Sequence, residues 1–347
     1  TLFRSLGSRQ PYLPLQQGFD EFFGLPYSND MWPVYYDGTP WKDTASFRSK
    51  YPPLPLYEGN KVVKIISTLD DQAQLTSLYT QRAVQFITEN KNHPFFLYLA
   101  HYAIHVPLDA DKRYLDKYLA KGLDSTEAKY ASLIAGMDKS LGDVMDYLEK
   151  TGIDKNTVIL FMSDNGGLSL SPPRSGLAHT QNLPLRAGKG SVYEGGIRVP
   201  MIAKWPGQIN PGTMNQEALI IEDFFPTILQ IAGISPKKYK SQIDGESFLL
   251  RFSGKSANND NRLFVWHVPN KWTPKDGPGI NFYGAARLGK WKYVYSMRTG
   301  KEELYDLSHD IGEEHDLSVE HPEKTKEIAN RVSERLLKVG AQMPTKR

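Results

Sequence analysis

ILFMSDNGGLSL, at residues 159–170, joins an apolar run to two polar residues and two glycines. The run over 157–162 predicts a strand that is buried on both faces. In an open α/β sheet, ligands bind beyond the carboxyl ends of the strands, which is where Asp164 and Asn165 fall. Their carboxylate and carboxamide oxygens suit Ca²⁺ or Mg²⁺ rather than zinc. The same residues also favour an ordinary turn, so this motif alone leaves both a metal site and a turn open.

Strands and helices alternate on both sides of this stretch. Residues 1–60 are rich in Pro, Tyr and Gly without a sustained period, and they predict surface loops. Strands separated by helices indicate parallel pairing with right-handed crossovers, and therefore a layered α/β sheet flanked by helices. Apolar runs and helical spacing predict strands over 95–100 and 199–204 and helices over 70–90, 124–150 and 222–232.

The character of the sequence changes after about residue 250. Gly289-Lys290 falls between two short aromatic runs and predicts a tight hairpin turn. We therefore predict an α/β domain over 1–250 and a smaller C-terminal α+β subdomain, a short antiparallel sheet plus a helix, over 251–347. The predicted elements of this subdomain are strands at 263–267, 282–289, 290–296 and 303–307 and a helix after Pro322.

The composition of the 347 residues excludes several classes of function. The formal net charge of +3 is too small to indicate a nucleic-acid partner. No apolar stretch approaches the roughly 18 residues of a membrane span, and no signal peptide is visible. With no cysteine, the chain forms no disulfide, thiolate metal site or cysteine nucleophile of its own.

Two other stretches place polar residues near predicted strand ends. His105 lies in HYAIHVP (101–107), where Pro107 restricts the preceding backbone; this suits a fixed donor or acid but does not require one. Lys189 lies between two glycines in LRAGKGSVYEGGIRVP (185–200), where its ammonium can reach an anion, although the spacing is not that of a P-loop. Three polar motifs near strand ends are harder to attribute to chance than one.

These motifs resemble those of the sulfatases of the alkaline phosphatase superfamily, of the arylsulfatase and carbohydrate-sulfatase type. The resemblance covers nearly the whole chain, from about Gly7 onward. It implies an alkaline-phosphatase-like fold, hydrolysis of an aryl or carbohydrate sulfate ester, and a formylglycine nucleophile. The stretches that carry it are VILFMSDNGG, GKGSVYEGGIRVPMIAKWPG, PFFLYLAHYAIHVPL, QGFDEFFGLPYSND, DFFPTILQIAGI and ELYDLSHDIGEEHDL.

The resemblance also implies roles for individual residues. Asp164 and Asn165 match calcium ligands of the family, with Mg²⁺ the second choice. Lys189 matches the catalytic lysine that binds the sulfate oxygens, and His105 matches the histidine that contacts the leaving-group oxygen as a general acid. For substrate binding, Ser28 and His179 fall at weaker matches near the sulfate pocket.

Other family motifs are missing from this sequence. It has neither the Asp-Asp pair that completes the calcium site, nor the K-W-H-L-G segment, nor a C-x-P-S-R or S-x-P-[SA]-R segment for the nucleophile. We therefore expect a catalytic domain that is incomplete at its N-terminus, a poor calcium binder and an inactive enzyme when alone. The central sheet should then expose apolar surface, covered by an N-terminal fragment or by another protomer.

Two alternatives remain open beside the sulfatase. One is a non-catalytic binder of sulfated glycans, and the other is a phosphoesterase or phosphonate hydrolase of the same superfamily. Trp266, His267 and Trp272 could stack on a sugar or fill a seam between domains. The resemblance implies a sulfated small molecule or glycan as partner, with no nucleic acid or membrane, and a periplasmic or secreted location.

Overall fold

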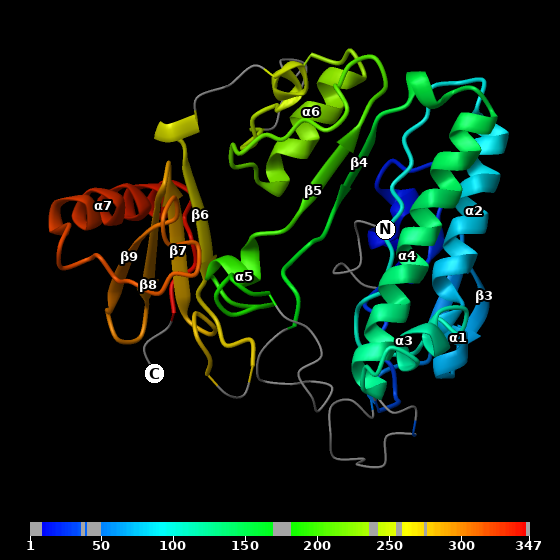
Figure 1. The fold of residues 1–347 in the computed structure, drawn as a ribbon, viewed down its shortest axis with the longest axis horizontal. Coiled ribbons are helices and arrows are strands. Elements are labelled where there is room, and N and C mark those ends of the chain that lie inside the picture. Colours follow the sequence, from blue (N-terminus) through cyan, green and yellow to red (C-terminus); the bar gives the residue numbers. More distant parts are fainter. Residues whose placement is uncertain are drawn as a thin grey trace. The chain divides into compact units, whose positions relative to one another are not determined.

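The computed structural model describes residues 9–35, 39, 50–168, 182–235, 242–254, 259–273 and 276–344 (Figure 1). The described residues divide into two compact units, unit 1 up to Asp154 and unit 2 from Lys155 onward. The domain limits predicted at residue 250 stay a prediction. No helix among the described residues is both long and apolar enough to span a bilayer.

The helices of unit 1 follow the predicted spacing. Asp124 caps α4, because its Oδ1 accepts hydrogen bonds from the backbone N–H groups of Thr126 (2.7 Å) and Glu127 (3.1 Å). α2 packs against α4, and the Oγ1 of Thr80 donates to the Oγ of Ser140 at 2.5 Å across that contact. The helices of this unit are α1 (Leu69–Ala73), α2 (Leu75–Asn90), α3 (Leu115–Leu119) and α4 (Ser125–Lys150).

Unit 1 also contains an antiparallel sheet of order β1-β2-β3 that was not predicted. Leu54 and Leu56 on β2 are buried in a cluster with Trp32 and Tyr79, so this strand is held by contacts distant in sequence. The prediction of loops throughout 1–60 was therefore wrong for part of this segment. The strands are β1 (Phe23–Gly24), β2 (Leu54–Glu58) and β3 (Lys61–Ile66).

Residues 95–100, predicted as a buried strand, form no strand in the structure. Phe96 and Tyr98 are 51% and 41% exposed. An apolar run becomes a strand only when a neighbouring strand satisfies its backbone groups, and the described part of the chain supplies none here. This prediction was wrong.

The stretch at 159–170 begins with β4 (Ile159–Met162) in unit 2, so the predicted strand is confirmed, but its residues are only partly buried and the prediction of burial on both faces was wrong. Its partner is β5 (Met201–Lys204), and the two strands pair antiparallel with Met162 opposite Met201. The expected parallel pairing was wrong for these strands, because the intervening loops return the chain beside β4 in the opposite direction. Neither strand is buried, and Ile202 is 61% exposed. A two-stranded ribbon with open faces is marginally stable unless something covers it.

The C-terminal sheet has the antiparallel order β6-β7-β8-β9, and its predicted hairpin between β7 and β8 is confirmed. One face packs Ala286 and Leu304 against α7, while the other packs Ala285 and Tyr305 against the segment that contains Tyr193. Figure 1 shows α7 and α5 on opposite faces of this sheet. Its elements are β6 (Leu263–Val268), β7 (Tyr283–Leu288), β8 (Trp291–Ser296), β9 (Glu302–Asp306) and α7 (Pro322–Lys338).

The remaining helices are short. α6 ends just before Gly233, whose φ of +70° suits a residue that terminates a helix, as the sequence predicted. The α-helices are α5 (Glu194–Ile197) and α6 (Phe224–Ile231), and the 3₁₀ helices are η1 (Gln10–Tyr12), η2 (Pro14–Gln16), η4 (Asp154–Asn156), η5 (Ile221–Asp223), η7 (Leu249–Ser253) and η8 (Asn259–Asn261).

Candidate active site

Unit 2 brings two of the predicted motifs into direct backbone contact. The loop after β4 and the loop over 185–198 exchange two hydrogen bonds. The Gly166 N–H donates to the Gly196 carbonyl at 3.0 Å, and the Lys189 N–H donates to the Gly167 carbonyl at 3.0 Å. The two motifs therefore form one structure, although about 20 residues separate them in the sequence.

Asn182 joins the same two loops through its side chain. Its Oδ1 accepts from the Gly167 N–H at 3.2 Å, while its Nδ2 donates to the carbonyls of Gly167 (2.9 Å) and Ala187 (3.0 Å). The sequence analysis did not single out this asparagine. Its position three residues before the 185–200 motif was the only local signal.

The glycines of both motifs allow this close approach. A Cβ on Gly166 would lie 1.8 Å from the Gly195 carbonyl oxygen, and one on Gly195 would lie 2.3 Å from the Ala187 carbonyl oxygen. Real Cβ atoms do not approach oxygen atoms this closely, so both positions require glycine. Gly166 thus allows the approach between the two loops, while Gly195 allows the loop over 185–198 to fold closely on itself.

Asp164 and Asn165 follow β4 at the edge of this structure. Asp164 is exposed and Asn165 is half-buried, with its Nδ2 donating to the Gly166 carbonyl at 2.9 Å. A carboxylate and a carboxamide suit calcium in kind, but a calcium ion takes six to eight oxygen ligands. The described residues contain no group of three or more His, Asp or Glu side chains arranged to hold a metal. These two residues fit part of a calcium site, and the specific ion stays a prediction.

Lys189 is half-buried between Gly188 and Gly190. The indole ring of Trp272 packs on Gly190, since a Cβ there would lie 2.0 Å from its Cζ3 atom. Asn281 holds the Trp272 loop, accepting from the backbone N–H groups of Trp272 (2.7 Å) and Thr273 (3.0 Å) through Oδ1. Trp272 therefore lies beside the predicted sulfate-binding lysine.

The other two aromatic residues considered for sugar stacking have structural partners. The Trp266 ring lies 5.5 Å from the Lys292 Nζ and packs in the cluster around Tyr193. His267 forms a hydrogen bond from Nε2 to the Gln342 carbonyl at 2.7 Å. These contacts hold both side chains in unit 2, and their role in sugar stacking stays a prediction.

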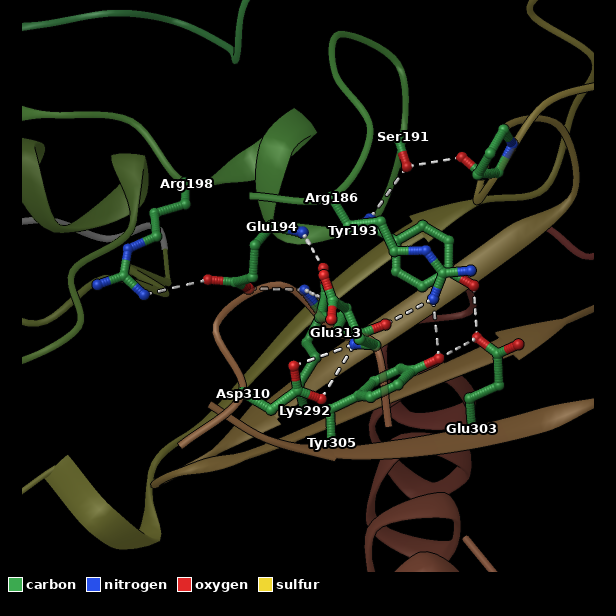
Figure 2. A network of polar contacts seen from close by, with 12 residues as sticks. Arg186, Ser191, Tyr193, Glu194, Arg198, Lys292, Glu303, Tyr305, Asp310 and Glu313 are labelled. Carbon is green, nitrogen blue, oxygen red and sulfur yellow. Dashed lines mark hydrogen bonds and ion pairs between the residues drawn. The ribbon is translucent and has the colours of Figure 1, made fainter. Parts of the chain in front are cut away.

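A buried polar network joins the loop over 185–198, called the Lys189 loop below, to the C-terminal sheet (Figure 2). Lys292, whose side chain is fully buried, places its Nζ 2.7 Å from Oε1 of Glu194 and 3.4 Å from Oε1 of Glu313. Burial raises the pKa of the Glu313 carboxyl to about 7 against the attraction of Lys292. Burial also opposes ionisation of Glu194, but the Lys292 charge and hydrogen bond outweigh it and lower that pKa. The single ammonium of Lys292 thus faces two carboxyl groups, and it stabilises the charged form of Glu194 more than that of Glu313.

His105 belongs to unit 1 and is partly buried. Its Nδ1 lies 2.7 Å from the Val106 carbonyl oxygen, which can only accept, so the proton is on Nδ1. The neighbouring His101 is different: burial lowers its pKa to about 4, and its Nε2 bonds to the Ser140 Oγ at 3.0 Å. Of the two histidines in this motif, His101 is therefore part of the helical packing.

Asp109 is a residue of unit 1 that the sequence analysis missed. Burial raises its pKa to about 7, with the negative charge of Asp70 adding to the shift. Its Oδ2 is buried without a hydrogen-bond partner among the described residues. Its only sequence signal was an acidic residue four positions after His105.

The remaining predicted substrate residues have separate outcomes. The hydroxyl of Ser28, in unit 1, donates to Asp30 Oδ1 at 2.7 Å. His179 lies outside the described residues. The joint placement of Ser28 and His105 with Lys189, Asp164 and Asn165 stays a prediction.

Comparison with known proteins defines the class. The sequence profile of the family described as Sulfatase matches residues 3–234, and that described as N-sulphoglucosamine sulphohydrolase, C-terminal, matches residues 188–342. This chain therefore belongs to the sulfatase family, and the predicted resemblance and fold class are confirmed.

Individual relatives agree with this assignment. A protein called "Sulfatase" from Formosa agariphila is 34% identical over 305 residues, covering 81% of this chain and 52% of the relative. N-acetylgalactosamine-6-sulfatase from Rattus norvegicus is 35% identical over 255 residues, covering 70% of this chain and 44% of the relative. The crystal structure of Ps i-CgsB in complex with k-i-k-neocarrahexaose superposes with a TM-score of 0.73 at 26% identity, covering 94% of this chain and 68% of that one. The chain spans about half the length of the curated relatives it matches.

Proposed function

We propose that this chain supplies part of the active site of a carbohydrate sulfatase, a sulfuric ester hydrolase. The observation that carries the proposal is the contact between the Asp164–Gly167 loop and the Lys189 loop inside unit 2. It joins the loop that carries two hard oxygen donors to the loop that carries a cationic residue, and a sulfate ester needs both kinds of group around its oxygens.

Each predicted residue then has a defined task. Lys189 binds sulfate oxygens and offsets the negative charge that builds up during transfer. His105 protonates the oxygen of the leaving sugar, and Ser28 and His179 contact the substrate. Asp164 and Asn165 contribute oxygens to a calcium site; the bound ion would polarise the sulfate group.

The nucleophile, in this proposal, comes from residues outside this chain. The sequence contains no cysteine and no serine in the family's nucleophile motif. A formylglycine from another segment would supply the attacking oxygen. This chain alone is then inactive and binds calcium poorly.

The same outside segment is the proposed partner of the β4–β5 ribbon. Support comes from the exposure of Ile202 and from the match to only about half the length of the relatives. Covering the ribbon would bury its apolar face and complete the sheet. A periplasmic or secreted location is proposed from the family alone.

The substrate class is proposed from the relatives named as N-acetylgalactosamine-6-sulfatases. The test is to link the chain to the sequence encoded directly upstream of Thr1 and to assay sulfate release from nitrophenyl sulfate and from N-acetylgalactosamine 6-sulfate with calcium. The chain alone is the control and should show no turnover. An upstream sequence without a C/S-x-P-x-R segment, together with binding of the sulfated sugar, would instead support the non-catalytic binder.

A further inference from the structure

The Lys189 loop is tied to the C-terminal sheet on both sides of the lysine. On one side, Nη1 of Arg186 donates to the Tyr305 hydroxyl at 3.0 Å and to the Glu313 carbonyl at 2.9 Å. On the other side, Glu194 begins α5 and accepts from the Lys292 Nζ at 2.7 Å. Figure 2 shows these contacts converging on the sheet from the loop.

The contact at Glu194 involves both its side chain and its backbone. Its N–H donates to Oε2 of Glu313 at 2.7 Å, while its carboxylate faces Lys292. All three side chains are buried, at 3%, 0% and 0% exposure for Glu194, Glu313 and Lys292. A buried charge pair cannot exchange its partner for water at low cost, so its geometry is narrowly fixed.

We propose that Lys292 is a positioning residue for Lys189, acting through its buried ion pair with Glu194. The reaction it serves rests on the proposed function, but its effect on the loop does not. Lys292 lies on β8, which pairs with β7 on one side and β9 on the other, so its backbone is held in place. The ion pair therefore fixes the position of the loop relative to a rigid strand. A displacement of about 1 Å in a charge-binding group can cost about 10²-fold in rate.

The two carboxylates should respond differently to neutralisation. Glu194→Gln removes the charge that Lys292 holds on the loop side. Glu313→Gln keeps a carbonyl oxygen to accept the Glu194 N–H and leaves one cation facing one anion. We therefore expect Lys292→Met and Glu194→Gln to loosen the loop, and Glu313→Gln to leave it in place.

Lys290→Met is a matched control in the turn that leads into β8. Lys290 lies two residues away, pairs with Asp306 at 2.6 Å, and is 49% exposed. Its removal deletes a lysine and an ion pair without touching the loop. This variant should leave the rate of backbone hydrogen exchange in residues 186–198 unchanged.

Two measurements on the chain as it exists test the positioning. Hydrogen exchange of peptides from 186–198 should accelerate about tenfold or more in Lys292→Met and Glu194→Gln, while peptides from β7 and β8 stay protected. In chain labelled with 5-fluorotryptophan, the ¹⁹F resonance of Trp272, assigned by Trp272→Phe, should shift in these two variants because its ring packs on Gly190. In Lys290→Met, only the Trp291 resonance should shift, since Lys290 lies over that ring.

Unchanged exchange and an unshifted Trp272 resonance in Lys292→Met would overturn the proposal. So would equal acceleration in the loop and in β6–β9, because the role would then be stability of the sheet. In the linked, active protein, Lys292→Met should lower kcat/KM about 10²-fold. An inactive parent protein would refute the proposed function, while the exchange and ¹⁹F results would still decide the positioning role.

Discussion

Gly166→Ala should separate the two motif loops. The added Cβ would lie 1.8 Å from the Gly195 carbonyl oxygen and 3.1 Å from the Gly196 Cα. Ordinary contact begins near 3.4 Å, so the difference, 3.4 minus 1.8, requires a movement of 1.6 Å. Both obstacles are backbone atoms, which cannot rotate aside as a side chain can.

The cost has two parts. Forcing atoms into a packed region typically costs about 1–3 kcal/mol. The same movement breaks the hydrogen bonds Gly166 N–H to Gly196 O and Lys189 N–H to Gly167 O, at about 1 kcal/mol each. We expect a loss of about 3–5 kcal/mol in the free energy of unfolding of unit 2.

Urea unfolding followed by tryptophan fluorescence measures this loss, and hydrogen exchange of peptides from 185–197 locates it. Gly142→Ala is the control, since a Cβ at this position in α4 meets nothing within 4 Å. It should stabilise its helix by about 0.5–1 kcal/mol. A Gly166→Ala variant as stable and as protected as the parent would refute the inferred loop contact.

Four further results are expected. Lys189→Ala in the linked, active protein should lower kcat/KM by about 10²–10³-fold, because a preorganised cation is lost from a strongly charged transition state. His105→Ala should slow sugar sulfate hydrolysis by about 10²–10⁴-fold but nitrophenyl sulfate little, since only the sugar oxygen needs protonation; equal losses would remove the acid role. Chelation by EDTA should abolish turnover by the linked protein. A calcium titration of activity should then show weaker recovery in Asp164→Ala than in the parent protein. Folding raises the pKa of Glu313 from 4.5 to about 7. Its contribution to the free energy of unfolding is therefore complete below pH 4.5 and is lost as the pH rises through 7, about 3 kcal/mol in all. Urea unfolding from pH 4.5 to 8 should show a flatter dependence of stability on pH in Glu313→Gln.

The parts of the fold predicted well depend on local sequence. α4 begins where Asp124 caps it, and the β7–β8 hairpin turns at Gly289, whose φ is +56°. The strand predicted at 95–100 and the parallel pairing of β4 depended on neighbours that an apolar run does not identify. Strand pairing is set by residues far along the chain, and this information is absent from a local period.

The candidate site shows the same difference between residues in local motifs, which were predicted, and residues joined by distant contacts, which were not. Asp164 and Lys189 were found because each lies in a motif with unusual glycines. The ion pair between Lys292 and Glu194 was not predicted, since the two residues are 98 positions apart in the sequence. Lys292 also lies in an aromatic strand, where alternation alone does not tell a buried lysine from an exposed one.

Ala285 and Ala286 are consecutive on β7, fully buried, and face opposite sides of the C-terminal sheet. One contacts the Lys189 side and the other contacts α7, with only the thickness of a strand between them. The size of each of these two side chains is therefore limited by a different set of packing partners. Across the family, we expect residue 285 to covary with Val192 and Tyr193, and residue 286 with Ile328 and Val332, so that alternate residues of this strand vary with the Lys189 loop and with α7.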